Sequence, residues 1–573
     1  MNRFRPLILA ATVVLAALLA YGLWTLPKPQ HAEADGFSSA RAVEDIKVIS
    51  KEHHSVAHPK ERARVREYLV QRLQELGADT IKQFRYDSLT GPQGKHVTYT
   101  FDAVNVLAEF APLHESEDTT CLMFIAHYDS RYSQPMPKDT VWSYGAADDG
   151  YGVSVILETV SQLLLDRDLW QQGIKVLFTD AEEVGMMGMK AAWEHDREIF
   201  DNVGLIINIE ARGPFGPALM FEACSGNEKV LDLYADAAKY PYTYSLTTVV
   251  YGFMPNFTDF TIVKDEIPGL NFSTIADINH YHTNLDNFSN VNEKSIQHYG
   301  EQVLPVAKAY LTGAEYADKD YLKSDDDSVN FSIPVLGLLN FSKGQYILIN
   351  IIFCVLFLVL FGLEGVRGRI KASKVFKTSV RVLLISFGVL ALGEFIAYLC
   401  SLAAGAKFKP FGVVQGISFD NAAMIASALI MTVVAVMVYM ALRRKAVRKV
   451  AGSMRASAAV NAVAKNACNI LYGTMALMFV LSIALFVTIR ENMMFFIPFV
   501  CATAAMLLYR MTSLKVWIVL GIGLMLLHVF SFYYALAMAL TIGAFGAVTM
   551  LVFIDLMALI PLADLYMISP GKK

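Results

Sequence analysis

The chain has 573 residues, too many for a single domain, and 54% of them are hydrophobic, a high share for a protein surrounded by water. Its formal net charge of −4 gives no indication of nucleic-acid binding. The six cysteines form no CxxC pair, and Cys121 and Cys224 lie in apolar strand-like runs, so we expect buried thiols rather than a disulfide.

An apolar run, Leu7–Trp24, follows Arg3 and Arg5 near the start of the sequence. Such a run is either a membrane anchor or a signal peptide. A cleavage-like Ala32-Glu33-Ala34 lies well beyond the run, so we favour an anchor that is kept. In both cases the positive end stays inside and the chain that follows is exported. We assign residues 1–34 to this anchor and its short tail.

Residues 35–320 alternate helix-like and strand-like segments. Apolar residues recur near a period of 3.6 in the expected helices, which are Ala40–Lys51, Lys60–Leu76, Gly150–Leu165, Met186–His195, Glu228–Ala238 and Asn292–Leu311. The expected strands are Val104–Phe110, Leu122–Ala126, Ile174–Thr179, Leu205–Ile209 and Ala218–Phe221. Several are solidly apolar, which is typical of strands covered on both faces. We therefore expect an α/β domain with a mixed, mostly parallel central sheet flanked by helices.

A charged linker at residues 321–344 leads into a predicted α-helical membrane domain at residues 345–573. Its seven apolar segments are each near the roughly 20 residues that cross a bilayer, at about 345–363, 382–400, 421–442, 467–489, 493–509, 515–534 and 536–560. Basic residues gather in alternate loops, above all Arg367–Arg381 and Arg443–Lys465. Together with the anchor, this bias predicts eight spans with both termini cytoplasmic, and it places residues 35–320 outside the cytoplasm.

Three acids, Glu394, Asp555 and Asp564, lie in or near the expected spans. An acid inside a membrane can mark a transport path. Because the three are isolated in the sequence, we favour the interpretation that each is a buried acid that is bonded to a neighbouring helix or is protonated.

The stretch Cys121–Gly150 carries the first candidate site. An apolar strand ends at His127 and Asp129, and the turn GAADDG then supplies Asp148 and Asp149 before a helix. His127 can bind a metal through one ring nitrogen while Asp129 accepts a hydrogen bond from the other. A salt-bridged histidine and a helix-capping aspartate are the other interpretation of this stretch.

Further acids and histidines follow the later strands. They are Asp180, Glu182 and Glu183 after Ile174–Thr179, Glu210 after Leu205–Ile209, and His280, His282 and Asp286 late in the domain. The carboxyl ends of strands in a doubly wound sheet meet at one crevice, so these side chains should converge. Carboxylates with a few histidines suit zinc or a similar divalent ion.

These residues form five motifs. They are His127-Tyr-Asp129, Gly145-Ala-Ala-Asp148-Asp149-Gly-Tyr-Gly152, Asp180-Ala-Glu182-Glu183-Val-Gly185, Asn208-Ile-Glu210 and Tyr281-His282-Thr283-Asn-Leu-Asp286. In this order they resemble the di-zinc aminopeptidases of metallopeptidase family 28, over roughly residues 40–310. An exported domain followed by a multi-span region further resembles the vacuolar and endoplasmic-reticulum membrane proteases of that family.

The resemblance implies two zinc ions per chain, with Asp148 as the ligand that bridges them. His127 and Glu210 would complete one metal site, and Glu183 and His282 the other. Members of the family carry either Asp or Glu at the position of Glu210.

Other roles are also implied by the resemblance: general base for Glu182, orientation of His127 for Asp129, and support of the His282 loop for Asp286. His280 is the competitor for the last metal position, and the Tyr-His-Thr context favours His282. The family often has a cis peptide after the bridging aspartate, which is the Asp148–Asp149 bond here.

The implied activity is removal of N-terminal residues from peptides outside the cytoplasm. Arg212, Glu222 and Tyr281 are candidate substrate contacts, although Arg212 also fits an ordinary surface ion pair. Glutaminyl cyclases share the fold but use one zinc, and the complete two-metal set favours hydrolysis. A receptor or scaffold with an inactive peptidase domain would lack ligands or the base. A peptide-binding or transport protein, whose exported domain only gathers peptides, is a further alternative.

Overall fold

The computed structural model describes residues 4–23, 26–92, 98–114, 120–136, 139–252, 256–412, 414, 417, 421–447 and 456–568. The chain divides into two compact units. The polar unit comprises Trp24–Ser332 with Leu336–Lys343, and the helical unit comprises Met1–Leu23, Ile333–Val335 and Gly344–Lys573.

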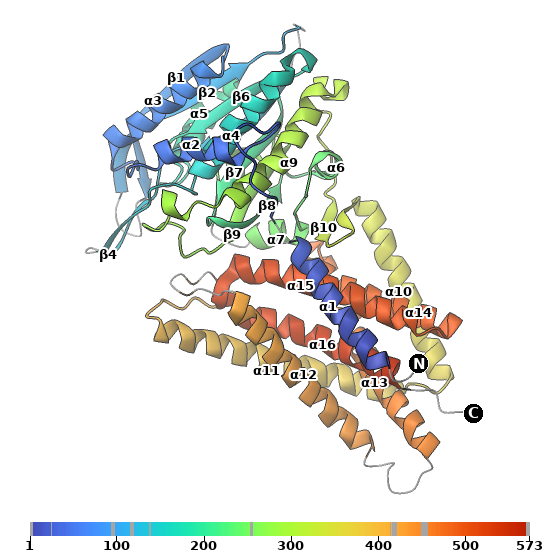
Figure 1. Ribbon diagram of the computed structural model, residues 1–573. Coiled ribbons are helices and arrows are strands. Elements are labelled where there is room, and N and C mark those ends of the chain that lie inside the picture. The colour runs from blue at the N-terminus through green and yellow to red at the C-terminus, as the bar shows by residue number, and fades with distance from the viewer. Residues whose placement is uncertain are drawn as a thin grey trace. The chain divides into compact units, whose positions relative to one another are not determined.

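A central sheet organises the polar unit (Figure 1). Its described strands are seven, in the order β1-β2-β6-β3-β7-β9-β8. They span Thr80–Pro92 (β1), Thr98–Phe110 (β2), Cys121–His127 (β3), Gly173–Thr179 (β6), Val203–Ala211 (β7), Phe215–Ala223 (β8) and Gly269–Ala276 (β9). Strands β6, β3, β7 and β9 run parallel to one another, whereas β1, β2 and β8 pair antiparallel. The predicted fold class, a mixed and mostly parallel sheet flanked by helices, is confirmed.

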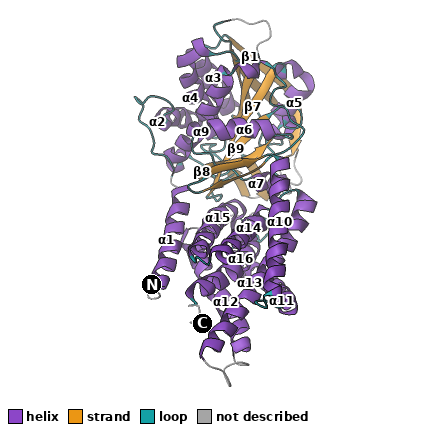
Figure 2. Ribbon diagram, turned by 90° about the vertical axis from the view of Figure 1, so that its right-hand side faces the viewer, coloured by secondary structure: helices purple, strands orange, loops and turns teal. Residues whose placement is uncertain are grey.

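Helices pack against both faces of this sheet. They are α2 (Ser39–Ile49), α3 (Pro59–Glu75), α4 (Gly150–Leu163), α5 (Met187–His195), α6 (Glu228–Ala237), α7 (Ser245–Gly252), α8 (Phe260–Val263) and α9 (Glu293–Thr312). Figure 2 shows α2, α4 and α9 on one side of the strands and α5 on the other. The six helices expected from the sequence are all present, with ends within two residues of the prediction. Helix α4 is buried along most of its length because it is apolar nearly all round.

Two sheet strands, β1 and β9, were not among the expected ones. Strand β1 lies at the edge of the sheet and is polar, so its sequence lacks an apolar run. Strand β9 is buried, but it carries Asn271, Ser273 and Thr274, whose side chains find hydrogen-bond partners inside the unit. A short hairpin of β4 (Tyr132–Met136) and β5 (Asp139–Trp142) leaves the stretch between β3 and α4.

The segment predicted as a linker contains regular structure. Strands β10 (Val329–Ile333) and β11 (Gly337–Phe341) form a two-stranded sheet. The Ser332 backbone N–H donates to the carbonyl of Thr243 at 3.0 Å, and the Ser328 N–H donates to the Asn227 side chain at 2.9 Å. Through these contacts much of the segment packs as part of the polar unit. Its alternating apolar residues explain why it forms two paired strands.

The helical unit is built of long apolar helices. They are α1 (Arg5–Leu23), α10 (Lys343–Val366), α11 (Ala372–Ala403), α12 (Asn421–Val447), α13 (Ala456–Ile489), α14 (Met493–Thr512), α15 (Val516–Leu540) and α16 (Phe545–Met567). By length and composition, seven described segments could cross a membrane, and the last of them, Val516–Met567, contains both α15 and α16. Eight spans and their orientation stay predictions. Arg3, Trp24 and residues 448–455 of the second basic loop lie outside the described residues.

The three acids expected in or near spans each have a partner on another helix. Glu394 on α11 accepts a hydrogen bond from the Gly546 N–H of α16 at 3.1 Å. Asp555 accepts from the Tyr533 hydroxyl at 2.7 Å, and Asp564 lies 3.5 Å from the Arg443 guanidinium. These contacts agree with the interpretation of acids bonded to neighbouring helices.

Candidate metal centre

The candidate ligands gather at the carboxyl ends of three adjacent parallel strands. His127 ends β3, Glu210 lies next to the end of β7, and Glu183 follows β6 in a loop. Because β3 lies between β6 and β7 in the sheet, the three strand ends bring these side chains to one place. Asp148 enters from the turn before α4, and His282 enters from the loop after β9.

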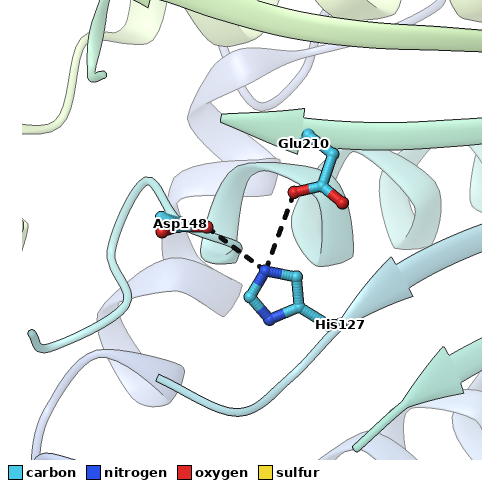
Figure 3. A group of neighbouring side chains, drawn as sticks. All are labelled: His127, Asp148 and Glu210. Carbon is cyan, nitrogen blue, oxygen red and sulfur yellow. Dashed lines mark hydrogen bonds and ion pairs between the residues drawn. The ribbon is translucent and has the colours of Figure 1, made fainter. Parts of the chain in front are cut away.

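The first ligand group contains His127, Asp148 and Glu210, shown in Figure 3. The Nε2 atom of His127 lies 3.2 Å from Asp148 Oδ1 and 3.7 Å from Glu210 Oε2. All three side chains point into the same space (Figure 3). His127 and Asp148 are buried, and Glu210 is half-buried.

The second group contains Asp148, Glu183 and His282. The Nε2 atom of His282 lies 3.3 Å from Asp148 Oδ2 and 3.1 Å from Glu183 Oε2. Within each group the candidate ligand atoms lie within 4.8 Å of one another. Asp148 therefore offers one carboxylate oxygen to each group, which is the arrangement a bridging ligand requires.

The turn that carries Asp148 is fixed by its neighbours. The next residue, Asp149, caps α4 and accepts a hydrogen bond from the Gly152 N–H at 2.9 Å. A Cβ on Gly152 would lie 2.3 Å from the Asp149 carboxylate, which explains why glycine stands there. The Asp148–Asp149 peptide bond is cis, as the resemblance implies. The helix-cap interpretation thus holds for Asp149 and leaves Asp148 to face the histidines.

Asp129 contacts both His127 and the loop that carries the two glutamates. Its backbone carbonyl lies 2.9 Å from His127 Nδ1, and its carboxylate Oδ1 lies 3.5 Å from the same nitrogen. The carboxylate also accepts the backbone N–H groups of Glu182 at 2.9 Å and Glu183 at 3.4 Å. Asp129 therefore positions the Glu182–Glu183 loop as well as the histidine.

Asp286 contacts the turn that carries Asp148 as well as the His282 loop. Its buried carboxylate accepts hydrogen bonds from the Ala147 N–H at 2.6 Å, the Ser143 hydroxyl at 2.8 Å and the Asp148 N–H at 3.4 Å. Its backbone N–H donates to the Thr283 carbonyl, next to His282, at 3.1 Å. Because the chain after His282 folds back onto the Asp148 turn, the Tyr144 N–H also donates to the Asp286 carbonyl at 3.2 Å.

The electrostatics of the centre show a surplus of buried acids. Burial opposes the charged form of His127, but hydrogen bonds to Asp129 and Asp148 and the charge of Glu210 raise its pKa well above the ordinary value. Burial also raises the pKa of Glu182 and of Glu210 well above the usual range. The charge of Glu210 raises the pKa of Glu182 further, and the charges of Asp149 and Asp148 raise that of Glu210. The acids of the centre therefore outnumber the basic groups that could neutralise them.

These residues fit a divalent metal. The buried oxygens Asp148 Oδ2 and Glu183 Oε1 have no hydrogen-bond partner within the described residues, although both have lone pairs to offer. Imidazole nitrogens together with carboxylate oxygens are a donor set that zinc accepts. A cation at each group would offset the repulsion between the acids.

Two residues next to the centre were not predicted from the sequence. Arg131 lies 3.2 Å from Glu183 Oε2 through Nη1, which also donates to the Glu183 carbonyl. Asp259 is buried and accepts a hydrogen bond from the Thr179 hydroxyl, and burial raises its pKa to about 6. Arg131 belongs to the same strand exit as Asp129, a proximity that could have indicated it. Asp259 follows no apolar strand, so no comparable signal existed.

The candidate substrate contacts divide into two kinds. Tyr281 stacks on the His282 ring, with centroids 3.6 Å apart, and Arg212 is half-buried directly after β7. Glu222 is buried, and it pairs with the Lys264 ammonium at 2.6 Å and the Asn271 amide at 3.0 Å. That pair occupies the Glu222 carboxylate. His280 lies 3.4 Å from Asp277 and belongs to neither ligand group, whereas His282 belongs to the second group.

Comparison with known proteins adds the family. Residues 105–307 match the model of Peptidase family M28. The chain carries a peptidase family M28 domain.

Two similar curated proteins are named as a metallopeptidase and as a protease. Endoplasmic reticulum metallopeptidase 1 of Mus musculus is 28% identical over 253 residues, which are 43% of this chain and 26% of that protein. A vacuolar membrane protease of Lodderomyces elongisporus is 27% identical over 271 residues, 44% of this chain and 26% of that protein. The matched part of the chain therefore spans about a quarter of the length of these curated relatives.

Solved structures of low identity also match. A leucine aminopeptidase precursor from Bacteroides thetaiotaomicron covers 50% of this chain and 99% of its own, with 18% identity and a TM-score of 0.38. The glutaminyl cyclase of Porphyromonas gingivalis covers 48% of this chain and 98% of its own, with 19% identity and a TM-score of 0.37.

Proposed function

We propose that this protein is a membrane-anchored zinc metallopeptidase that binds two zinc ions and removes N-terminal residues from peptides outside the cytoplasm. The observation that carries the proposal is the position of Asp148, with Oδ1 3.2 Å from His127 and Oδ2 3.3 Å from His282. A single-metal enzyme has no need of a carboxylate directed at two separate ligand groups. The M28 domain supports a peptidase in particular.

In this proposal, His127, Asp148 and Glu210 hold one zinc ion, and Asp148, Glu183 and His282 hold the other. Zinc supplies Lewis acidity toward the scissile carbonyl and lowers the pKa of a water molecule toward neutrality. The protein holds the ligands in place before any metal binds, because Asp129 positions the Glu183 loop and Asp286 positions the Asp148 turn.

Glu182 is the proposed general base. Its backbone is held by Asp129, while its own carboxylate belongs to neither ligand group. It removes a proton from the attacking water and delivers a proton to the leaving amine. Burial and the neighbouring Glu210 raise the pKa of Glu182 well above the ordinary value. A carboxylate with a higher pKa is a stronger base.

Peptide N-termini are the proposed substrates because the site is rich in acids. A free α-amino group is positively charged near neutral pH, and it is attracted to a crevice whose buried side chains are mostly carboxylates. Tyr281 and Arg212 are the proposed contacts for the rest of the peptide, since both lie beside the centre and the Glu222 carboxylate is occupied.

The membrane assignment is also part of the proposal. We propose that the helical unit anchors residues 35–320 to a membrane, and the basic loops between its helices support a position of that domain on the opposite side of the membrane. Both termini then lie in the cytoplasm.

The test uses the full chain purified in detergent. Metal content is measured by elemental analysis, and hydrolysis is followed with a dipeptide and with the same dipeptide acetylated at its N-terminus. We expect two zinc ions per chain, release of the N-terminal residue and little action on the acetylated peptide. One zinc ion together with cyclisation of N-terminal glutamine would instead identify a glutaminyl cyclase. Binding of peptide without turnover would identify a binding or transport protein.

A further inference from the structure

The helical unit contains a cavity whose lining residues are far in sequence from the candidate metal ligands. It has a volume of about 320 Å³, and the residues that line it include Arg369, Lys465, Cys468, Tyr509, Arg510 and Ile568. They come from the turn after α10, from α13, and from the ends of α14 and α16. The volume is at the lower end of the roughly 300–1,000 Å³ typical of small-molecule sites.

The cavity is positively charged, although one acid lies behind it. Glu364 is fully buried, and its two carboxylate oxygens lie 2.8 Å from the Arg369 guanidinium and 3.0 Å from that of Arg510. In the described helical unit the ion pairs involve Arg369, Arg443 and Arg510, and none involves Lys465. Three cations therefore line the cavity against one acid, which leaves a net positive charge.

The two arginines are held with donors to spare. A guanidinium has five N–H groups. Glu364 uses a few of them, and the Nε of Arg510 is buried with no hydrogen-bond partner among the described residues. Arg369 is 40% exposed, so its remaining donors reach the opening. An acid that fixes two arginines in this way prepares them for an anion with several acceptor oxygens.

Nearby backbone groups do not compete for these cations. The last carbonyls of α16 carry partial negative charge and lie beside the cavity at Leu565 and Ile568. The Lys515 ammonium donates to the carbonyl of Leu565 at 3.0 Å, and the Arg5 guanidinium donates to that of Ile568 at 3.4 Å. These two additional cations satisfy the helix end and leave Arg369, Lys465 and Arg510 to a ligand.

The position of the cavity along the apolar helices indicates the kind of ligand. It lies where three apolar helices end and where basic residues concentrate, which is the level of lipid phosphates for a helix that crosses a bilayer. Its lining also contains Val460 and Leu565, and Val460 is 36% exposed at the surface of α13. A cationic pocket with an apolar side matches a phosphate joined to a glycerol and its acyl chains.

We propose that this cavity binds the phosphate of an anionic glycerophospholipid, with Arg369, Lys465 and Arg510 as its donors. Binding there would join α10, α13, α14 and α16 at one end of the helical unit. The site is independent of the metal centre and of peptide hydrolysis.

The test follows thermal unfolding of the full chain in neutral detergent. Phosphatidylglycerol, phosphatidylcholine and inorganic phosphate are each titrated at equal phosphate concentration and equal ionic strength. We expect phosphatidylglycerol to raise the unfolding midpoint in a saturable way and to remain bound in native mass spectra. An equal rise with inorganic phosphate would identify a phosphate ion site and overturn the lipid proposal. An equal rise with phosphatidylcholine would overturn it as well.

Lys465→Gln is the informative variant because Lys465 lines the cavity without taking part in the Glu364 ion pairs. We expect phosphatidylglycerol to bind about fivefold more weakly, the equivalent of about 1 kcal/mol for one cation near the membrane surface. Lys377→Gln is the matched control, since Lys377 is an exposed cation in the first turns of α11 that does not line the cavity. Equal weakening by both variants would show general surface attraction, and no weakening by Lys465→Gln would exclude the site.

Discussion

The adjacent pair Glu182 and Glu183 offers the sharpest test of the proposed chemistry. Both are glutamates of one loop, and Asp129 accepts the backbone N–H of each. Their side chains differ in surroundings. Glu183 lies 3.1 Å from His282 and 3.2 Å from Arg131, whereas the carboxylate of Glu182 belongs to neither ligand group. Substitution of the two residues should therefore have different consequences.

Glu182→Gln keeps the size of the side chain and leaves the hydrogen bond between its backbone and Asp129 in place. We expect the zinc content and the thermal midpoint to stay as in the wild type. Turnover should fall by about 10⁴, the upper end for a general base, because the same group serves both the water and the leaving amine. That loss corresponds to about 5.5 kcal/mol in the activation free energy. It should appear in kcat with little change in KM, since the proton moves only on the way to the transition state.

Glu183→Ala should behave differently, because it removes a ligand and leaves Arg131 without its partner carboxylate at 3.2 Å. We expect loss of metal together with loss of activity. The assay compares zinc per chain, thermal midpoint and hydrolysis rate for both variants in parallel. Near wild-type turnover in Glu182→Gln, or a loss of zinc equal to that of Glu183→Ala, would refute the assignment of roles.

Three further outcomes are expected. Asp286→Ala removes three hydrogen bonds around the Asp148 turn. We expect it to lower the free energy of unfolding by about 2–4 kcal/mol in thermal unfolding and to weaken zinc binding in a metal titration. Unchanged zinc affinity would contradict the positioning role. Because the pKa values of His127 and His282 are raised, zinc must displace protons from them, so affinity should rise with pH and calorimetry in two buffers should detect proton release. Protease added outside intact cells should cut the peptidase domain and spare the loop Arg443–Lys465, and the reverse result would invert the topology.

Elements with a strong apolar pattern could be predicted from the sequence. Strands β3 and β6 and helix α4 are apolar because both sides of each are covered, and their bounds follow from that pattern. Strand β1 was not predicted because it is polar and lies at the edge of the sheet. Strand β9 was not predicted because its buried polar side chains interrupt the apolar run. Partners far apart in sequence satisfy those groups, and such partners are visible only in three dimensions.

The candidate site shows the same division. The types of the candidate ligand residues and their order could be predicted from the sequence, because each of these residues follows a strand end or a turn signal. The contacts of Asp286 with the Asp148 turn were not, since they join residues 138 and 139 positions apart. Arg131 and Asp259 were missed for a related reason, as a cation or an acid outside a motif acquires meaning only from what the fold places beside it.

Two carboxylates that bind no metal explain how the others are held together. Acids packed at a single centre repel one another, and burial makes that repulsion stronger because water no longer screens it. Asp129 and Asp286 lie behind the ligands, and each accepts backbone N–H groups from the segment that carries a ligand. Such charge-assisted hydrogen bonds are among the stronger ones in a protein, so the chain itself maintains the positions of Glu183 and Asp148. A bound cation would then need only to neutralise acids that the chain already holds in position, so we expect Asp129 and Asp286 to matter for metal affinity as much as for folding.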